Sequence, residues 1–227
     1  MSITRTRISA SSFAPELGPD ELAYLLNLIR NSGLKGRHLE IGTAAGGTLC
    51  AMMKCFATGE RPPFVVVDPM AYFADQLELV KQNLRQHGLD PSEVDIRVSR
   101  SSDAFQCAEA AGETFDLVFI DGAHKIRFVT QDLRWARLVN VGGIICMHDY
   151  NPQQRGVMLA VDRFLRKHSN YQREALISNL LVLRKHAASR SKEISSADGL
   201  WALALSPWLQ LKKSLAKRLG RRGLILD

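Results

Sequence analysis

The stretch HLEIGTAAGGT, residues 38–48, has the pattern of a buried strand that runs into a glycine turn and then into a helix. Glycine adopts positive φ without steric cost and lets a ligand approach the backbone closely. The first N–H groups of the following helix have no partner within the helix, so they favour polar or anionic ligands. The segment therefore predicts a ligand site at Gly42, Gly46 and Gly47, although a tight strand-to-helix connection also requires glycine for purely structural reasons.

Segments with helical and strand periodicity alternate along the rest of the chain. Apolar residues spaced by three and four predict helices over about 19–33, 47–57, 73–87, 126–138 and 156–167. Short apolar runs predict strands at 38–41, 64–67, 96–98, 117–120 and 144–147, with a closing strand pair at 175–177 and 181–183. Apolar strands separated by helices are typical of a parallel sheet covered on both faces. We therefore predict an α/β fold: a Rossmann-like, doubly wound, mostly parallel sheet.

The composition is that of an ordinary globular domain. Of 227 residues, 46% are hydrophobic and 23% charged. No apolar run reaches the roughly 18–20 residues of a membrane span, and the N-terminus lacks the apolar centre of a secretory signal. The four cysteines form no Cys-x-x-Cys pair, which favours structural thiols in a reducing compartment. These features predict a cytoplasmic protein.

The net charge of +7 is concentrated near the C-terminus. From His186 onward, eight Lys or Arg residues stand against three Asp or Glu residues. A nucleic-acid enzyme more often carries basic residues across its folded domain. We therefore expect no nucleic-acid partner.

Acidic residues follow the predicted strands at the points where these strands end. In doubly wound sheets, ligands bind beyond the carboxyl ends of the strands. These ends are Glu40–Gly42, Asp68, Ser101–Asp103, Asp121 and His148–Tyr150. Asp68 lies 22 positions after Gly46, close to the roughly 20-residue offset at which an acid binds ribose hydroxyls in nucleotide folds. Capping of the next helix is the structural alternative for Asp68.

The glycine spacing separates two classes of cofactor. Dinucleotide dehydrogenases use Gly-x-Gly-x-x-Gly, whereas this loop has Glu40 at the strand end and alanine at position 44. The pattern resembles the Glu/Asp-x-Gly-x-x-x-Gly signature of class I S-adenosylmethionine-dependent methyltransferases. FDLVFIDGAH (115–124) and VGGIICMHDY (141–150) resemble the fourth and fifth strands of a small-molecule O-methyltransferase subgroup, which includes macrocin O-methyltransferase and cephalosporin-hydroxylase-like relatives. The resemblance covers roughly residues 34–185.

The resemblance implies S-adenosylmethionine as cofactor and methyl transfer to a hydroxyl of a small molecule, such as a sugar or glycosylated metabolite. Glu40 and its loop would meet the aminoacyl end, where a carboxylate suits the cofactor's ammonium group. Asp68 would bind the ribose, and Ser101, Ser102 and Asp103 would border the adenine. The full set of implied cofactor-binding residues is Glu40, Gly42, Thr43, Ala44, Gly46, Thr48, Asp68, Ser101, Ser102, Asp103 and Asp121.

Two mechanisms fit the implied catalytic residues His124, His148 and Asp149. In the first, Asp121, His148 and Asp149 bind Mg²⁺ or another divalent cation that acidifies the substrate hydroxyl. In the second, His124 or His148 acts as general base. A non-catalytic cofactor-binding domain, tethered to a membrane or an assembly by its basic tail, is the alternative function.

The resemblance ends near Lys185, and we divide the chain there. Residues 1–185 form the predicted cofactor-binding domain, with an N-terminal helical region at 1–33. Residues 186–227 are predicted as a linker and a basic amphipathic helix that starts at Ser206-Pro207. Its apolar stripe within 206–219, formed by Trp208, Leu211, Leu215 and Leu219, would contact a second subunit or the inner membrane surface.

Overall fold

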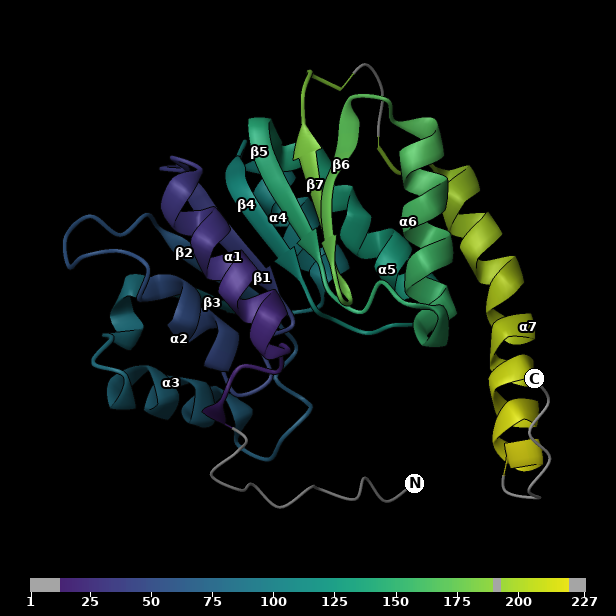
Figure 1. Cartoon of the computed structure of the whole chain (residues 1–227), viewed down its shortest axis with the longest axis horizontal. Coiled ribbons are helices and arrows are strands. Elements are labelled where there is room, and N and C mark those ends of the chain that lie inside the picture. The colour runs from purple at the N-terminus through teal and green to yellow at the C-terminus, as the bar shows by residue number, and fades with distance from the viewer. Residues whose placement is uncertain (1–12, 190–192, 221–227) are drawn as a thin grey trace.

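The computed structural model describes residues 13–189 and 193–220, with side chains up to residue 211 (Figure 1). Seven strands form one sheet in the order β3-β2-β1-β4-β5-β7-β6. The strands are β1 (Arg37–Ile41), β2 (Phe64–Asp68), β3 (Val94–Val98), β4 (Phe115–Ile120), β5 (Val139–Met147), β6 (Tyr171–Ile177) and β7 (Leu180–Lys185). Strands β1 to β5 run parallel to one another. Strand β7 is antiparallel to its neighbours β5 and β6, so the edge strand β6 runs in the same direction as β1 to β5. The predicted doubly wound fold is confirmed.

Helices cover both faces of the sheet. One face carries α1 (Pro19–Asn31), α2 (Gly47–Met53) and α3 (Gln76–Gln86), and the other carries α4 (Ser101–Ala110), α5 (Ile126–Asp132) and α6 (Arg155–Lys167), with α7 (Ser196–Gly220) outside them (Figure 1). The 3-10 turns are η2 (Pro91–Glu93), η3 (Leu133–Leu138) and η4 (Pro152–Gln154). Because side chains alternate along a strand, Val65 and Val67 enter one core while Val66 enters the other.

Three elements differ from the sequence-based expectation. Residues 101–110, where the sequence analysis predicted no helix, form α4, which buries a narrow stripe of Ala104, Phe105 and Ala108. The helix predicted over 126–138 divides into α5 and η3. Strand β5 begins at Val139, ahead of the Gly142-Gly143 pair that we expected to precede it.

The C-terminal helix α7 begins at Ser196, so the predicted start at Ser206-Pro207 is wrong and Pro207 lies inside the helix. Its first turns pack on the domain: Ala202 is fully buried, and Trp201, Leu205 and Leu209 contact the core beneath α5 and α6. The local sequence did not show this packing, because it depends on partners in α5 and α6.

An ionic contact holds the start of α7 to α6. The buried carboxylate of Asp198 accepts hydrogen bonds from Arg163 Nε at 2.8 Å and Lys167 Nζ at 2.5 Å. Burial opposes the charge, but these cations and Ser195 hold the pKa of Asp198 well below its usual range. The exposed apolar side chains on this helix include Leu200, Leu203 and Leu211. Leu215 and Leu219 of the predicted stripe lie outside the described side chains, and contact of this stripe with a membrane or a second subunit stays a prediction.

No helix within the described ranges 13–189 and 193–220 is both long enough and apolar enough to span a membrane.

Deleting residues 186–227 should lower the free energy of unfolding by about 3 kcal/mol or more, because several apolar side chains lose their burial and Arg163 and Lys167 lose Asp198. Deleting only residues 212–227 should change it by less than about 1 kcal/mol, since the buried contacts of α7 precede this cut. Urea unfolding followed by circular dichroism measures both values. Equal stability of the two shortened proteins would support the division at Lys185.

Candidate active site

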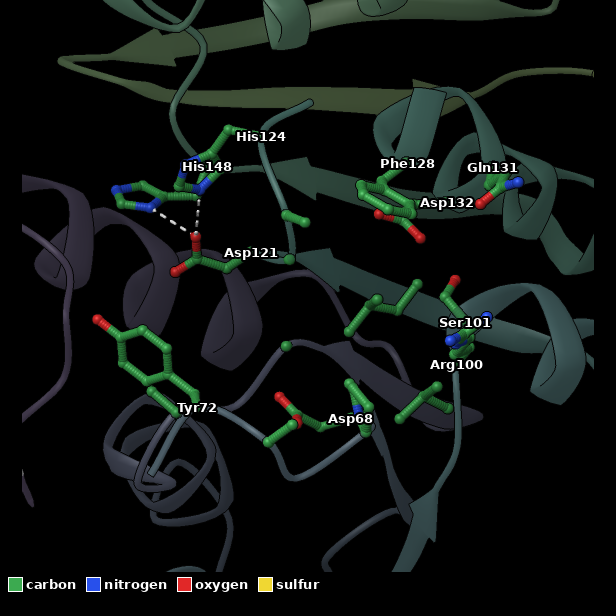
Figure 2. A pocket seen from close by; sticks show the side chains of 18 of the residues that line it. Asp68, Tyr72, Arg100, Ser101, Asp121, His124, Phe128, Gln131, Asp132 and His148 are labelled. Atoms are coloured by element: carbon green, nitrogen blue, oxygen red, sulfur yellow. Dashed lines mark hydrogen bonds and ion pairs between the residues drawn. The ribbon is translucent and has the colours of Figure 1, made fainter. Parts of the chain in front are cut away.

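A cavity of about 950 Å³ opens at the carboxyl ends of β1, β2, β4 and β5 (Figure 2). Asp68 lies at one wall, and Asp121, His124 and His148 cluster across from it. Phe128, Gln131 and Asp132 from α5 close a third side, beyond Arg100 and Ser101. A much smaller cavity adjoins it and is lined by Ala14, Glu16, Glu40, Gly42, Thr43, Ala44, Gly47, Thr48 and Asp121. The strand ends that the sequence analysis selected thus do converge on one site.

The glycine loop after β1 lines both cavities, and the protein's own packing requires its glycines. A Cβ at Gly42, whose φ is +81°, would lie 2.4 Å from the carbonyl oxygen of Asp121. Gly46 precedes α2 with a φ of +83°, and Ala44 is also left-handed at +45°. A non-glycine residue in this region stores about 1–3 kcal/mol of strain. The structural explanation of these glycines therefore applies, and their role in ligand binding stays a prediction.

Asp68 organises the cavity wall from the end of β2. Its Oδ2 accepts from Thr43 N at 3.0 Å, and its Oδ1 accepts from Met70 N at 2.6 Å and Gln76 Nε2 at 3.3 Å. Burial raises its pKa, and these hydrogen bonds oppose the rise. A carboxylate has about four acceptor positions, so the three bonds leave capacity for a ligand hydroxyl.

Glu40 is buried at the end of β1 and borders the smaller cavity with Thr43 and Thr48. Thr43 Oγ1 donates to its Oε2 at 2.5 Å. Burial raises the pKa of Glu40 to about 8, and the neighbouring carboxylates Asp121 and Asp68 add to the rise. A cation entering the smaller cavity would be stabilised here, because it would offset this unfavourable burial of negative charge.

The third strand end contributes the N-terminus of α4. Ser101 and Ser102 line the large cavity, and Ser101 Oγ accepts from Trp135 Nε1 at 3.0 Å. Asp103 is exposed and does not belong to the lining, and its carboxylate accepts from Ser102 Oγ. The buried acid at this end of the cavity is Asp132, which burial holds at a pKa of about 7.

The histidines bridge three carboxylates. His148 Nδ1 lies 3.0 Å from Asp121 Oδ1, and its Nε2 lies 3.3 Å from Glu21 Oε2. His124 also faces Asp121, with its Nε2 3.9 Å from Asp121 Oδ1 (Figure 2). The same Nε2 lies 2.8 Å from Asp149 Oδ2. Asp149 has a φ of +58°, so backbone strain accompanies this arrangement.

Both histidines are cationic at neutral pH in this arrangement. The carboxylates of Asp121 and Asp149 raise the pKa of His124 to about 9. Burial opposes the charge on His148, but Asp121, Asp149 and Glu21 raise its pKa to about 9 as well. Burial alone would raise the pKa of Asp121, but its hydrogen bonds with the two histidines outweigh this effect and lower the pKa. The hydrogen bond with His124 likewise lowers the pKa of Asp149.

A divalent cation finds only part of a ligand set in this cluster. Ligand atoms of Asp121, His148 and Asp149 lie within 4.8 Å of one another. However, His148 is protonated and faces a carboxylate with each ring nitrogen, whereas a metal ligand must offer a free lone pair. Mg²⁺ is commonly held by one or two carboxylates with several waters. Asp121 and Asp149 therefore fit Mg²⁺, and His148 does not.

Sequence reasoning missed Glu16, Glu21 and Asp132. Glu16 lines both cavities, and Glu21 contacts His148 across 127 positions of sequence. Asp132 had one local signal, since it is a carboxylate on the apolar face of a predicted helix. Glu21 resembled an ordinary acid in the first turn of a helix.

Comparisons with known proteins indicate a methyltransferase fold. Residues 39–150 match the family described as a methyltransferase domain, a segment that begins in β1 and ends directly after β5. Among solved structures, the O-methyltransferase from Bacillus cereus in complex with S-adenosylhomocysteine is 18% identical, with a TM-score of 0.61 over 77% of this chain and 84% of that chain. The chain has the Rossmann-like methyltransferase fold. No curated protein matches the sequence.

Two further methyltransferase structures show the same fold. The O-methyltransferase TomG from Streptomyces achromogenes, involved in tomaymycin synthesis and solved with S-adenosylmethionine, is 17% identical, with a TM-score of 0.60 over 75% of this chain and 82% of that one. CalS11, a TDP-rhamnose 3′-O-methyltransferase of calicheamicin biosynthesis, is 16% identical, with a TM-score of 0.58 over 72% and 76%. The narrower resemblance to the macrocin O-methyltransferase subgroup stays a prediction.

The imidazole rings of His124 and His148 should titrate well above the ordinary histidine pKa of about 6.5, towards 9, as followed by NMR. Since folding raises both values, the stability they contribute is complete below pH 6.5 and is lost as the pH rises towards 9. Asp121→Asn should shift both midpoints downward, because it removes a carboxylate that faces each ring. Midpoints near 6.5 in the unsubstituted protein would contradict the charge assignment.

Proposed function

We propose that this chain is an S-adenosylmethionine-dependent methyltransferase that methylates a hydroxyl of a small molecule. The observation that carries the proposal is the convergence of the glycine loop, Asp68 and the Asp121–histidine cluster on one cavity in a methyltransferase fold. A chain that only bound the cofactor would have no need for the cluster beside the cavity.

The residues around the two cavities suit the parts of this cofactor. Asp68 offers acceptor capacity to ribose hydroxyls, and Phe128 and Pro69 offer apolar walls to an adenine ring next to Ser101 and Asp132. Glu40 and the loop Gly42–Gly46 border the smaller cavity, where a cationic group is favoured. S-adenosylmethionine supplies a methyl group on a sulfonium, which is already a strong electrophile.

The protein's main chemical task is then to position the acceptor oxygen and to remove its proton. His124 and Asp149 are placed for this task, because both line the cavity and lie 2.8 Å apart. A positively charged ligand in the cavity disfavours the imidazolium form of His124 and so prepares it to accept a proton. His148 faces carboxylates with both ring nitrogens, so we assign it to holding Asp121 in place.

A divalent cation on Asp121 and Asp149 is the rival means of activating the hydroxyl. Bound there, Mg²⁺ would act as a Lewis acid on the acceptor oxygen. The two histidines already compensate the carboxylate charges, which removes the electrostatic need for an ion. We therefore favour the His124–Asp149 pair.

The acceptor class follows from the opening of the cavity. Tyr72 presents an exposed ring there, and Arg100 and Arg127 border the same space. An aromatic face beside charged groups suits a sugar or glycosylated metabolite, whose C–H faces pack on a ring while its hydroxyls bind polar groups. The likeness to a TDP-rhamnose methyltransferase adds support to this proposal.

The purified protein should bind S-adenosylmethionine and S-adenosylhomocysteine at micromolar concentration and should not bind NAD. Isothermal calorimetry measures all three. Asp68→Asn should weaken S-adenosylhomocysteine binding by about 1–3 kcal/mol, since a charged acceptor for the ribose hydroxyls becomes neutral. Glu78→Gln removes an exposed acid on the outside of α3 and should leave the affinity unchanged. Preferential binding of NAD would overturn the methyltransferase proposal.

Release of S-adenosylhomocysteine, measured over a panel of sugar nucleotides and glycosylated phenols, identifies an acceptor. With it, His124→Ala should reduce turnover by about 100-fold or more, while cofactor affinity stays within threefold. Turnover should rise from pH 7 towards 9, because His124 loses its proton over this range. Excess EDTA should have no effect. Loss of activity with EDTA and its return with Mg²⁺ would instead assign hydroxyl activation to an ion on Asp121 and Asp149.

A further inference from the structure

The segment Phe13–Gly18, here called the strap, precedes α1 and lies across the glycine loop. A Cβ at Gly47 would lie 2.4 Å from the carbonyl carbon of Ala14, so the two backbones are in direct contact. Asn83, fully buried on α3, donates its Nδ2 to Phe13 O at 3.0 Å and to Ala45 O at 2.9 Å. One amide group therefore joins the strap to the loop that borders the smaller cavity.

The other end of the strap is fixed to the active site. The buried carboxylate of Glu21 accepts from Gly18 N at 2.8 Å and from Asn179 N, in the β6–β7 turn, at 2.7 Å. The same carboxylate faces His148 Nε2 at 3.3 Å. The position of the strap is thus coupled to the glycine loop at one end and to the Asp121–His148 pair at the other.

Glu16 lies between these two attachments and lines both cavities. The residue remains exposed, but partial desolvation of its carboxyl raises the pKa, and Asp121 and Asp149 add to the rise while His148 opposes it. The lining of the smaller cavity combines Glu16, Glu40 and Asp121 and includes no Lys, Arg or His. Three carboxyl groups turned to one small space, without a basic side chain in its lining, suit a ligand group that is both cationic and small.

We propose that Glu16 binds the ammonium group of the cofactor's aminoacyl end, and that the strap holds it there. The inference rests on the proposed function, because it presumes the cofactor. It assigns a binding role to a residue outside the segment 39–150 that matches the methyltransferase family. Glu40 and Asp121 share the same group from the opposite side, so the ammonium is held between the strap and the carboxyl ends of β1 and β4.

The test compares two ligands that differ at this end only. S-adenosylhomocysteine carries the aminoacyl group, whereas 5′-methylthioadenosine retains the adenosine and the sulfur but lacks that group. Glu16→Gln should weaken S-adenosylhomocysteine binding about tenfold or more in calorimetry and should change the affinity for 5′-methylthioadenosine by less than twofold. Glu16→Asp keeps the charge and should recover part of the lost affinity. Glu60→Gln, which removes an exposed acid between α2 and β2, is the matched control.

Each outcome decides between distinct possibilities. Unchanged S-adenosylhomocysteine affinity in Glu16→Gln overturns the inference and leaves the proposed function standing. An equal loss for both ligands shows that Glu16 supports the cavity as a whole, which also overturns the ammonium contact. Failure of the unsubstituted protein to bind S-adenosylhomocysteine removes the proposed function itself. Thermal unfolding of each variant is measured alongside. Glu16→Gln is expected to unfold at the same temperature as the unsubstituted protein, because glutamine retains the shape of the glutamate side chain.

Discussion

The site depends on the contact between the turn after β1 and the turn after β4. Asp121 N donates to Ile41 O at 2.9 Å, and the carbonyl of Asp121 occupies the space that a side chain at Gly42 would need. This contact joins the two central parallel strands where their carboxyl ends open to solvent. It fixes the glycine loop and the Asp121 carboxylate relative to each other. The contact between these two turns therefore fixes the groups proposed to bind the cofactor relative to the groups proposed to accept the proton of the acceptor.

The carboxyl groups of the site fall into two groups, one with lowered and one with raised pKa values. Around Asp121 and Asp149, two imidazolium groups balance the carboxylates and hold their pKa values low. Burial raises the carboxyl pKa of Glu40 to about 8, and desolvation with Asp121 and Asp149 raises that of Glu16 against the opposing charge of His148. The first group is complete in the free protein, whereas the second gains stability when a cation enters. Cofactor binding and proton transfer can therefore depend on adjacent but separate groups of charges.

The sequence predicts the features that local pattern determines. The strand-to-helix turn at Gly42–Gly47, the acid at Asp68 and the acid at Asp121 all follow from apolar runs and from the rule that ligands bind beyond parallel strands. The sequence analysis missed Glu21 because its partners His148 and Asn179 lie more than 100 positions away. It missed Glu16 because this residue belongs to the strap, whose position depends on tertiary contacts. The start of α7 was misplaced for a related reason, since its first turns form against α5 and α6.

The structure also separates two histidines that the sequence left equivalent. Both follow parallel strands and both lie beside acids, so composition and spacing could not rank them. Both line the large cavity, but their burial differs: the side chain of His148 is 10% exposed and lies between Asp121 and Glu21, while that of His124 is 38% exposed. A buried imidazolium between two carboxylates cannot release its proton without leaving them uncompensated. The more exposed His124 keeps one face open to a ligand while Asp149 holds the other, and for this reason we propose His124 rather than His148 as the group that takes the acceptor proton.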